Sequence, residues 1–215
     1  MEKACAALLL AVLVAALRAR ADPCFSVFTD TSEISGDELA EVSGNAPNKW
    51  ESLAGALVCD VVSLRDAHFA EEFPKENMDT FKDYKVPVPY LVQQDGCFSV
   101  NFSKKRCLQR IVEGLDRYEI YLEFVEREYP RETQVREIMT KASNLIHIIK
   151  EKVKVVQLKE FDSNTKKQML SELPTSSKWS RNISVHAILR HLSTFVTDAY
   201  RAIRYINQQQ RKERP

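Results

Sequence analysis

The residues best suited to chemistry in this 215-residue chain are its four histidines and five cysteines. The histidines stand at positions 68, 147, 186 and 191, and their spacing matches neither H-E-x-x-H nor the Glu-x-x-His pairs that bind metals in helical bundles. The chain also lacks C-x-x-C, G-x-S-x-G and G-x-x-x-x-G-K-[ST]. We therefore expect no metal site and no cofactor, and we predict that the chain is not an enzyme.

The cysteines suit disulfide chemistry, because the chain begins like a secreted protein. Residues 1–21 carry a basic residue near their start, Lys3, continue as an apolar run over 4–17 and end in A-R-A, which is typical of a cleaved secretory signal peptide. The alternative, an N-terminal membrane anchor, is disfavoured because the run is shorter than the roughly 20 residues that a span needs. We expect a secreted, extracellular protein with a flexible segment over 22–46.

Removal of the signal peptide leaves four cysteines in an oxidising compartment. We predict a disulfide between Cys97 and Cys107, which enclose nine residues just before a predicted helix. Cys59 is predicted on the outer face of another helix, and Cys24 is its candidate partner. The alternative is that Cys24 and Cys59 are free or form intermolecular bonds.

Two further features concern the surface. Asn101 and Asn182 open N-x-[ST] patterns and are candidate glycosylation sites, although Asn182 falls in a predicted helix. The 31 basic and 30 acidic residues give a net charge of +1, which argues against nucleic-acid binding and against a polybasic membrane binder.

Four long helices must position these residues. Five glycines in 215 residues are fewer than the usual share of about 7%, which disfavours a fold with many turns. The prolines leave long free stretches in which apolar residues recur at spacings of 3 and 4, so we predict helices over 48–73, 103–129, 132–157 and 178–209. The clearest apolar stripe lies on the second helix, at Leu108, Ile111, Leu115, Tyr118, Leu122 and Val125.

The ends of these helices carry capping signals. Asn48 and Glu51 resemble a capping box at the start of the first helix, and Ser176 or Ser177 is the expected cap of the fourth. The β-branched residues that end the third helix leave a short strand as an alternative there.

The lengths of the connections predict the topology. The links over 74–102 and 158–177 are long, whereas the second and third helices are joined around Pro130 with almost no loop. Two long links and one short connection are what parallel first and second helices require. We predict an all-α, long-chain four-helix bundle with up-up-down-down topology, formed by residues 47–210.

The outer face of the fourth helix carries arginines and a tryptophan. If the apolar stripe of this helix faces inward and each residue turns by 100°, four residues point outward: Arg190, Arg201, Arg204 and Trp179. Arginine and tryptophan dominate protein–protein hot spots, so this face is a candidate partner surface. The alternatives are a solvated basic face, and a Trp179 that packs under the 158–177 link.

A motif around the cysteine pair resembles a known family. The pattern C-x9-C-x6-G-L-x2-[FY]-x3-L runs from Cys97 to Leu122 and resembles the interleukin-6/granulocyte colony-stimulating factor family of cytokines. The segment His186–Arg190, together with Phe195 and Arg201–Arg204, looks like the last helix of the interleukin-6 branch. The resemblance covers about 95–160 and 178–206.

The resemblance implies a cytokine that binds a non-signalling α-receptor and a shared signal-transducing receptor chain, and that drives Janus kinase–STAT signalling in immune and acute-phase responses. It assigns α-receptor binding to Phe98, Arg201 and Arg204. It assigns binding of the signalling chain to Trp179 and, on the first and third helices, to Ala56, Asp60, Met139 and Ala142. It implies a monomer when free.

One departure and two alternatives accompany the resemblance. Family members of the interleukin-6 branch commonly carry another close cysteine pair just after the first helix, whereas this chain has no cysteine over 67–73. A granulocyte colony-stimulating factor-like haematopoietic growth factor would share the Cys97–Cys107 pattern. A secreted helical carrier of lipid would also suit the composition, but it needs a large apolar pocket that single narrow stripes do not predict.

Overall fold

The computed structural model describes residues 48–98, 100–129, 131–153 and 161–212. The expected signal peptide, the segment 22–46 with Cys24, and the β-branched tail of the third helix lie outside the described residues. The described helices are α2 (Lys49–Glu72), α3 (Lys104–Glu128), α4 (Glu132–Val153), α5 (Ser163–Ser171) and α6 (Lys178–Lys212), with short 3-10 helices η2 (Met78–Phe81) and η3 (Gln93–Asp95). No strand occurs among these residues.

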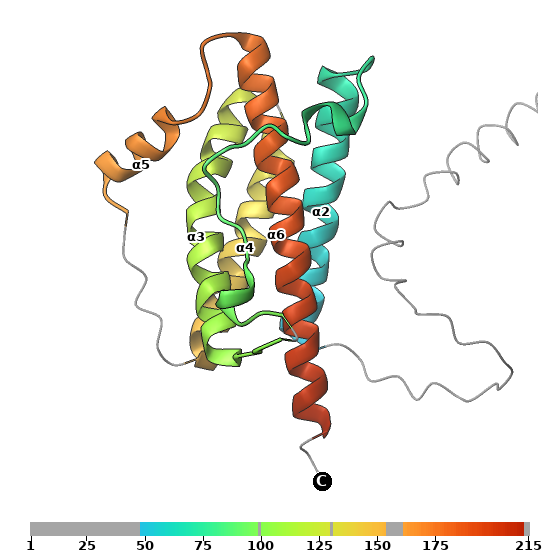
Figure 1. The fold of residues 1–215 in the computed structure, drawn as a ribbon, viewed down its shortest axis with the longest axis vertical. Helices are drawn as coiled ribbons and strands as arrows, with labels where there is room; N and C mark the ends of the chain where they lie inside the picture. Colours follow the sequence, from blue (N-terminus) through green and yellow to red (C-terminus); the bar gives the residue numbers. More distant parts are fainter. Residues whose placement is uncertain (1–47, 99, 130, 154–160, 213–215) are drawn as a thin grey trace, which may run out of the picture. The chain divides into compact units, whose positions relative to one another are not determined.

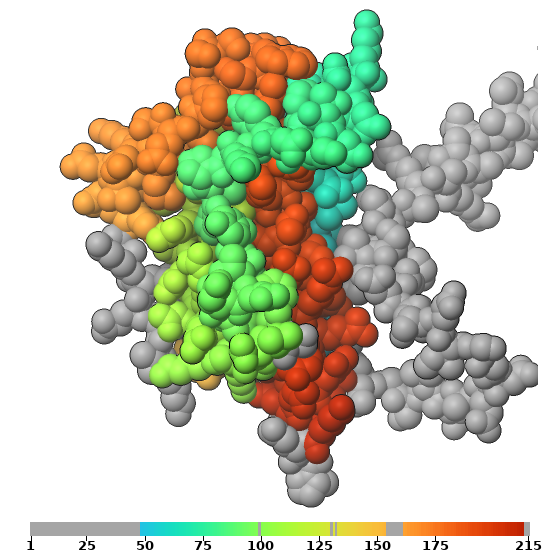
Figure 2. Space-filling view, viewed as in Figure 1, coloured from blue at the N-terminus to red at the C-terminus, as the bar shows by residue number. Residues whose placement is uncertain are grey.

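The bundle has the predicted up-up-down-down topology. In Figure 1, α2 and α3 run upward, and α4 and α6 run downward. The α2 helix packs against α6 and α4, while α3 packs against the same two helices from the other side. The link between α2 and α3 travels the length of the bundle and lies over α6 in Figure 2, as a connection between parallel helices must.

The predicted apolar stripes form the core. All six stripe residues of α3 are at most 1% exposed. The stripe residues of α6 are at most 2% exposed: Val185, Ile188, Leu192, Phe195, Val196, Ala199, Ile203 and Ile206. The two tyrosines of α3 also hold the long link, because the Tyr118 hydroxyl donates to Pro89 O at 2.7 Å and the Tyr121 hydroxyl donates to Pro87 O. The link is thereby fixed to the core although most of its residues are exposed.

Helix α2 begins differently from the prediction. Asn48 is its N-cap residue, but the Asn48 side chain makes no capping hydrogen bond, so the capping box is wrong. Its amide instead donates to Asn207 Oδ1 at 3.1 Å. Asn207 is buried, also accepts from Trp50 Nε1 at 2.8 Å, and donates to Glu51 Oε2 at 2.7 Å. These polar groups tie the start of α2 to the end of α6.

Helix α6 begins as predicted. The Ser177 hydroxyl accepts from Ser180 N at 3.0 Å, and Ser180 Oγ accepts from Ser177 N at 2.9 Å. This reciprocal pair satisfies backbone donors that the first turn leaves without a helical partner.

The short helix α5 was missed by the sequence analysis. Asp162 caps it by accepting from Thr165 N at 2.7 Å. Asp162 followed by a proline-free stretch was the available signal, but the nine residues of α5 carry no sustained apolar stripe.

The described residues form neither a membrane-spanning helix nor a cluster of metal ligands. No helix there combines the length and apolar character needed to cross a bilayer. No group of three or more His, Cys, Asp or Glu side chains is arranged to hold a metal ion in the same part of the chain.

Candidate partner-binding surfaces

The Cys97–Cys107 disulfide is confirmed, with the two Cα atoms 4.7 Å apart. It joins the end of the long link to the first turn of α3. Gly96 adopts a left-handed φ of 72°, and its carbonyl accepts from Ser103 N at 2.8 Å, which closes the loop around the disulfide. The loop that presents Phe98 is therefore held at both ends.

Aromatic contact joins this loop to the C-terminal half of α6. The Phe102 ring lies 4.7 Å from the ring of Tyr205, centroid to centroid, in an edge arrangement. Tyr205 directly follows Arg204 on an exposed part of α6, and Phe98 is half-buried in the loop. We define the Arg201 surface as Phe98, Phe102, Arg201, Arg204 and Tyr205.

The arginines give the Arg201 surface its charge. The Arg201 side chain is 64% exposed and forms an ion pair with Asp198 at 3.5 Å. Burial raises the pKa of Asp198, and the neighbouring Arg201 opposes that rise. Arg201 and Arg204 are one turn apart, so both guanidinium groups can bind the same acidic partner.

Phe102 and Tyr205 were missed by the sequence analysis. A tyrosine beside Arg204 on the outward face of the predicted helix was the available signal. Its partnership with Phe102 depends on the path of the link, and the residues alone do not indicate that path.

Trp179 is exposed at the opposite end of α6, where 53% of its surface meets solvent. Its ring makes edge contacts with Phe73 at 5.3 Å and with Phe81 at 6.1 Å. These neighbours belong to the segment after α2, not to the 158–177 link that the alternative named. We define the Trp179 surface as Trp179 and Phe81, which the buried Phe73 supports from the interior.

A third candidate face lies across α2 and α4. Ala56, Asp60 and Met139 are partly exposed, and Asp60 forms an ion pair with Lys141 that bridges the two helices. Ala142 is 2% exposed. The expectation that Ala142 contacts a partner is therefore wrong, because its methyl group belongs to the apolar stripe of α4 and packs inside the bundle.

Arg190 is also placed differently from the prediction. Its guanidinium donates to Lys82 O at 2.6 Å and to Tyr84 O at 3.1 Å. The link covers this part of α6, so Arg190 holds the link and does not extend the exposed basic face. Helical periodicity placed Arg190 outward but could not show what lies over it.

The remaining candidates concern modification. Cys59 is disulfide-bonded, and its partner is not among the described residues. Asn101 is exposed in a turn with a φ of 61°, whereas the Asn182 amide is partly buried and donates to Glu72. Of these two candidates, Asn101 is therefore the more accessible.

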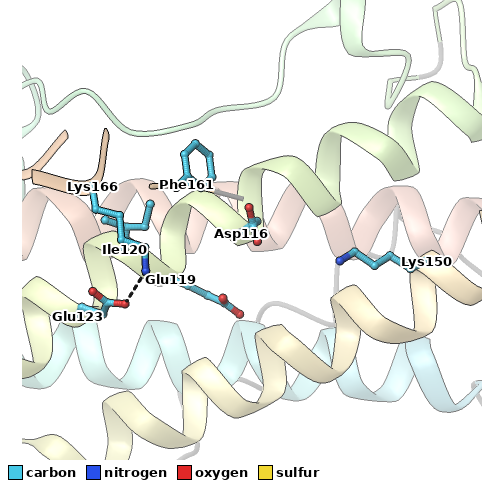
Figure 3. A pocket seen from close by; sticks show the side chains of 7 residues that line it. All are labelled: Asp116, Glu119, Ile120, Glu123, Lys150, Phe161 and Lys166. Carbon is cyan, nitrogen blue, oxygen red and sulfur yellow. Dashed lines mark hydrogen bonds and ion pairs between the residues drawn. The ribbon is translucent and has the colours of Figure 1, made fainter. Parts of the chain in front are cut away.

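A pocket of about 450 Å³ opens between α3, α4 and α5 (Figure 3). Carboxylates of α3 line it together with two lysines, and Lys166 Nζ pairs with Glu123 at 3.4 Å. Burial raises the pKa values of Asp116 and Glu119. This charged lining is the opposite of the apolar lining that a lipid carrier needs.

Comparison with known proteins identifies relatives across most of the chain. The family model for the Interleukin-6/G-CSF/MGF family matches residues 31–206. Interleukin-6 of Oncorhynchus mykiss is 37% identical over 79% of this chain and 79% of its own length. Interleukin-6 of Paralichthys olivaceus is 31% identical over 97% of this chain and 88% of its own, and that of Capra hircus is 32% identical over 74% and 76%.

Proposed function

Because the chain belongs to the Interleukin-6/G-CSF/MGF family, it is a cytokine, and we propose that it is secreted and assembles an α-receptor with a shared signal-transducing receptor chain. The assembly brings signalling chains together and activates Janus kinase–STAT signalling in immune and acute-phase responses. The family consists of signalling proteins, so the chain is not an enzyme. Secretion rests on the pattern of residues 1–21, and the free monomer rests on the family resemblance.

One observation carries the proposal: a single helix bears two separate candidate surfaces, one at its first turn and one in its C-terminal half. Trp179 and Arg201 are 22 positions apart on α6, which corresponds to about 33 Å along the helix axis. This separation leaves room for two proteins to bind at once. The rigid helix fixes the distance between them, so both surfaces can contribute to one assembly.

The Arg201 surface is the proposed α-receptor site. It combines aromatic rings with two cations, and such residues form the anchors of protein interfaces. The disulfide and the Phe102–Tyr205 contact hold the loop against α6 before any partner binds. Pre-ordering of this kind lowers the entropy cost of association.

The Trp179 surface and the α2–α4 face are the proposed contacts for the signalling chain. Trp179 offers a large apolar area that water now covers, and Phe73 and Phe81 keep its ring in place. Ala56, Asp60 and Met139 form the second contact. Ala142 is left out because it is buried.

Charge reversal at Arg201 tests the α-receptor site. We expect Arg201→Glu to weaken binding to an interleukin-6-type α-receptor ectodomain at least about 30-fold, since hot-spot residues contribute about 2 kcal/mol or more. Binding is measured by surface plasmon resonance, and helical content by circular dichroism. The matched control is Lys167→Glu, an exposed cation on α5. Unchanged affinity of the Arg201 variant would show that this site assignment is wrong.

Truncation of Trp179 tests whether the two surfaces bind different partners. We expect Trp179→Ala to leave α-receptor affinity within about threefold while it strongly lowers STAT phosphorylation in responsive cells. The control is Tyr90→Ala, because Tyr90 is an exposed aromatic residue outside both surfaces. Full activity of the Trp179 variant would refute the assignment of this surface.

A further inference from the structure

Two histidines lie in the interior beneath the Trp179 surface. His68 of α2 and His186 of α6 are each 1% exposed. Their rings are stacked, with centroids 6.2 Å apart and an interplanar angle of 13°. Neither residue has a role in the surfaces described above, so the pair calls for its own explanation.

The pair has few hydrogen bonds for such buried groups. In the described part of the chain, no partner reaches His68 Nδ1 or either ring nitrogen of His186. A neutral imidazole carries one N–H donor, whereas the protonated ring carries two and a full charge. The interior therefore accepts the neutral rings at moderate cost, whereas charged rings would find no hydrogen-bond partner at these three nitrogens.

Aromatic rings connect the pair to Trp179. The Phe73 ring lies 6.0 Å from each histidine ring and 5.3 Å from Trp179. Phe81 likewise contacts both His186, at 6.3 Å, and Trp179, at 6.1 Å. Phe73 and Phe81, the two rings that contact Trp179, therefore also contact the histidine pair.

Groups from every neighbouring element face the pair. Those that act on the pair are Arg65 and Glu71 of α2, Arg190 of α6, and Tyr129 at the end of α3, whose ring lies 4.7 Å from that of His68. Behind them, Arg131 binds Glu71, and Asp83 and His191 interact with Arg190. Glu71 is the one that favours a charged His68, but Glu71 is already bound by the Tyr129 hydroxyl at 2.6 Å and by Arg131. Arg190 and Arg65 disfavour a charged His186.

These surroundings determine the pKa values of His68 and His186. Burial, and then the neighbouring His186, lower the pKa of His68 to about 4. Burial, and then Arg190 and Arg65, lower the pKa of His186 to about 4. Both rings are neutral at pH 7, and an opened state would take up protons near the ordinary pKa of about 6.5. The closed state therefore loses stability as the pH falls from about 6.5 towards 4.

The segment that covers the pair is the one that can open. Residues 75–80 are exposed, and Arg190 holds the following turn through the carbonyls of Lys82 and Tyr84. Displacement of this segment would bring water to the histidines and would remove Phe81 from Trp179. The other end of α6 does not share these contacts, because it is held by Asn207 and by the Phe102–Tyr205 pair.

We propose that His68 and His186 are positioning residues for the Trp179 surface, and that their protonation in an acidic compartment releases this surface while the Arg201 surface keeps its form. The functional consequence rests on the proposed role of Trp179 in binding the signalling chain. In an acidified vesicle the protein would then lose the signalling chain before it loses the α-receptor.

Hydrogen exchange of the full mature chain tests the structural step without any mutation. Exchange is measured by mass spectrometry at pH 7.5 and 5.5 and corrected for the intrinsic rate at each pH. We expect protection over 68–84 and 178–186 to fall about tenfold if one histidine titrates, and up to about a hundredfold if both do. Protection over 104–112 and 199–207 should stay the same. Equal protection at both pH values, or an equal fall at both ends, would overturn the proposal.

Paired variants identify the titrating groups. We expect His68→Phe/His186→Phe to remove the acid-dependent loss, whereas His147→Phe, at a histidine on α4 whose side chain is 74% exposed, should leave it intact. An acid-dependent loss that persists in the double variant would overturn the assignment. If the double variant does not fold, the wild-type exchange measurement still decides the structural step.

Receptor binding separates this inference from the proposed function. We expect the affinity for the signalling chain to fall between pH 7.5 and 5.5 in the wild type but not in the double variant, with α-receptor affinity nearly constant in both. An unchanged signalling-chain affinity despite local opening would overturn the functional half of the inference. A Trp179→Ala protein with full activity at pH 7.5 would instead refute the proposed function and leave the exchange result standing.

Discussion

Replacement of Gly114 by alanine probes the closest approach between α3 and α6. A Cβ at Gly114 would lie 2.2 Å and 2.5 Å from two ring atoms of Phe195, whereas ordinary van der Waals contact begins at 3.4 Å. Phe195 is buried, and its ring lies 5.3 Å from the ring of Tyr118. Tyr118 in turn holds the link through Pro89 O. The ring of Phe195 therefore cannot move without disturbing the core and the link.

The magnitude follows from two opposing effects. Overpacking of a well-packed core costs about 1–3 kcal/mol, and the displacement required here puts the cost at the upper end. Alanine recovers about 1 kcal/mol relative to glycine in a helix interior. We expect a net loss of about 2 kcal/mol in the free energy of unfolding. For a domain of this size, the loss lowers Tm by about 4–8 °C.

Thermal and urea unfolding, followed by circular dichroism, measure the change. The matched background is Phe195→Leu, which removes the ring that the new methyl group meets. In that background Gly114→Ala should cost little or stabilise the protein, with a coupling energy of about 1–3 kcal/mol between the two sites. A Gly114→Ala protein as stable as the wild type would show that α3 and α6 do not approach this closely, and the reasoning would fail.

Three further predictions concern the ends and the surface of the bundle. Asn207→Leu leaves the Trp50 indole and a buried carboxylate without their partner, and should lower the free energy of unfolding by about 2–4 kcal/mol in urea titrations; no loss would mean that water replaces the amide. Peptide mapping without reduction should find Cys59 joined to Cys24, and a free Cys59 thiol would end that pairing. Protein secreted from animal cells should lose glycan mass on Asn101→Gln but not on Asn182→Gln, and the reverse pattern would contradict the accessibility argument.

The helices were predictable because their signal is local. Apolar spacing and proline positions indicate where α2, α3, α4 and α6 run, and the observed ends of α2, α3 and α6 differ from the predicted ones by at most about three residues. The Cys97–Cys107 bond follows from short spacing, and the topology follows from unequal connection lengths. Short α5 escaped because nine residues without an apolar stripe carry little periodic signal.

Predictions from neighbouring residues were wrong where a side chain binds a partner far away in the sequence. Asn48 and Glu51 have the spacing of a capping box, yet both bind Asn207, which lies more than 150 residues away in the chain. Arg190 points outward from α6 by period, yet the link covers it. A polar side chain takes the strongest partner available after packing, and the sequence near it does not show that partner.

The order and spacing of residues were enough to predict a four-helix bundle, the lack of catalytic motifs, and an outward Trp179 and Arg201 on one helix. Periodicity and motif spacing are properties of neighbouring residues, so they can be read before the chain folds. Three features emerged only when the chain was packed: the contact between Phe102 and Tyr205, the burial of Ala142, and the two buried histidines near Trp179. These contacts join residues far apart in sequence, and burial and pKa depend on what surrounds a group in space.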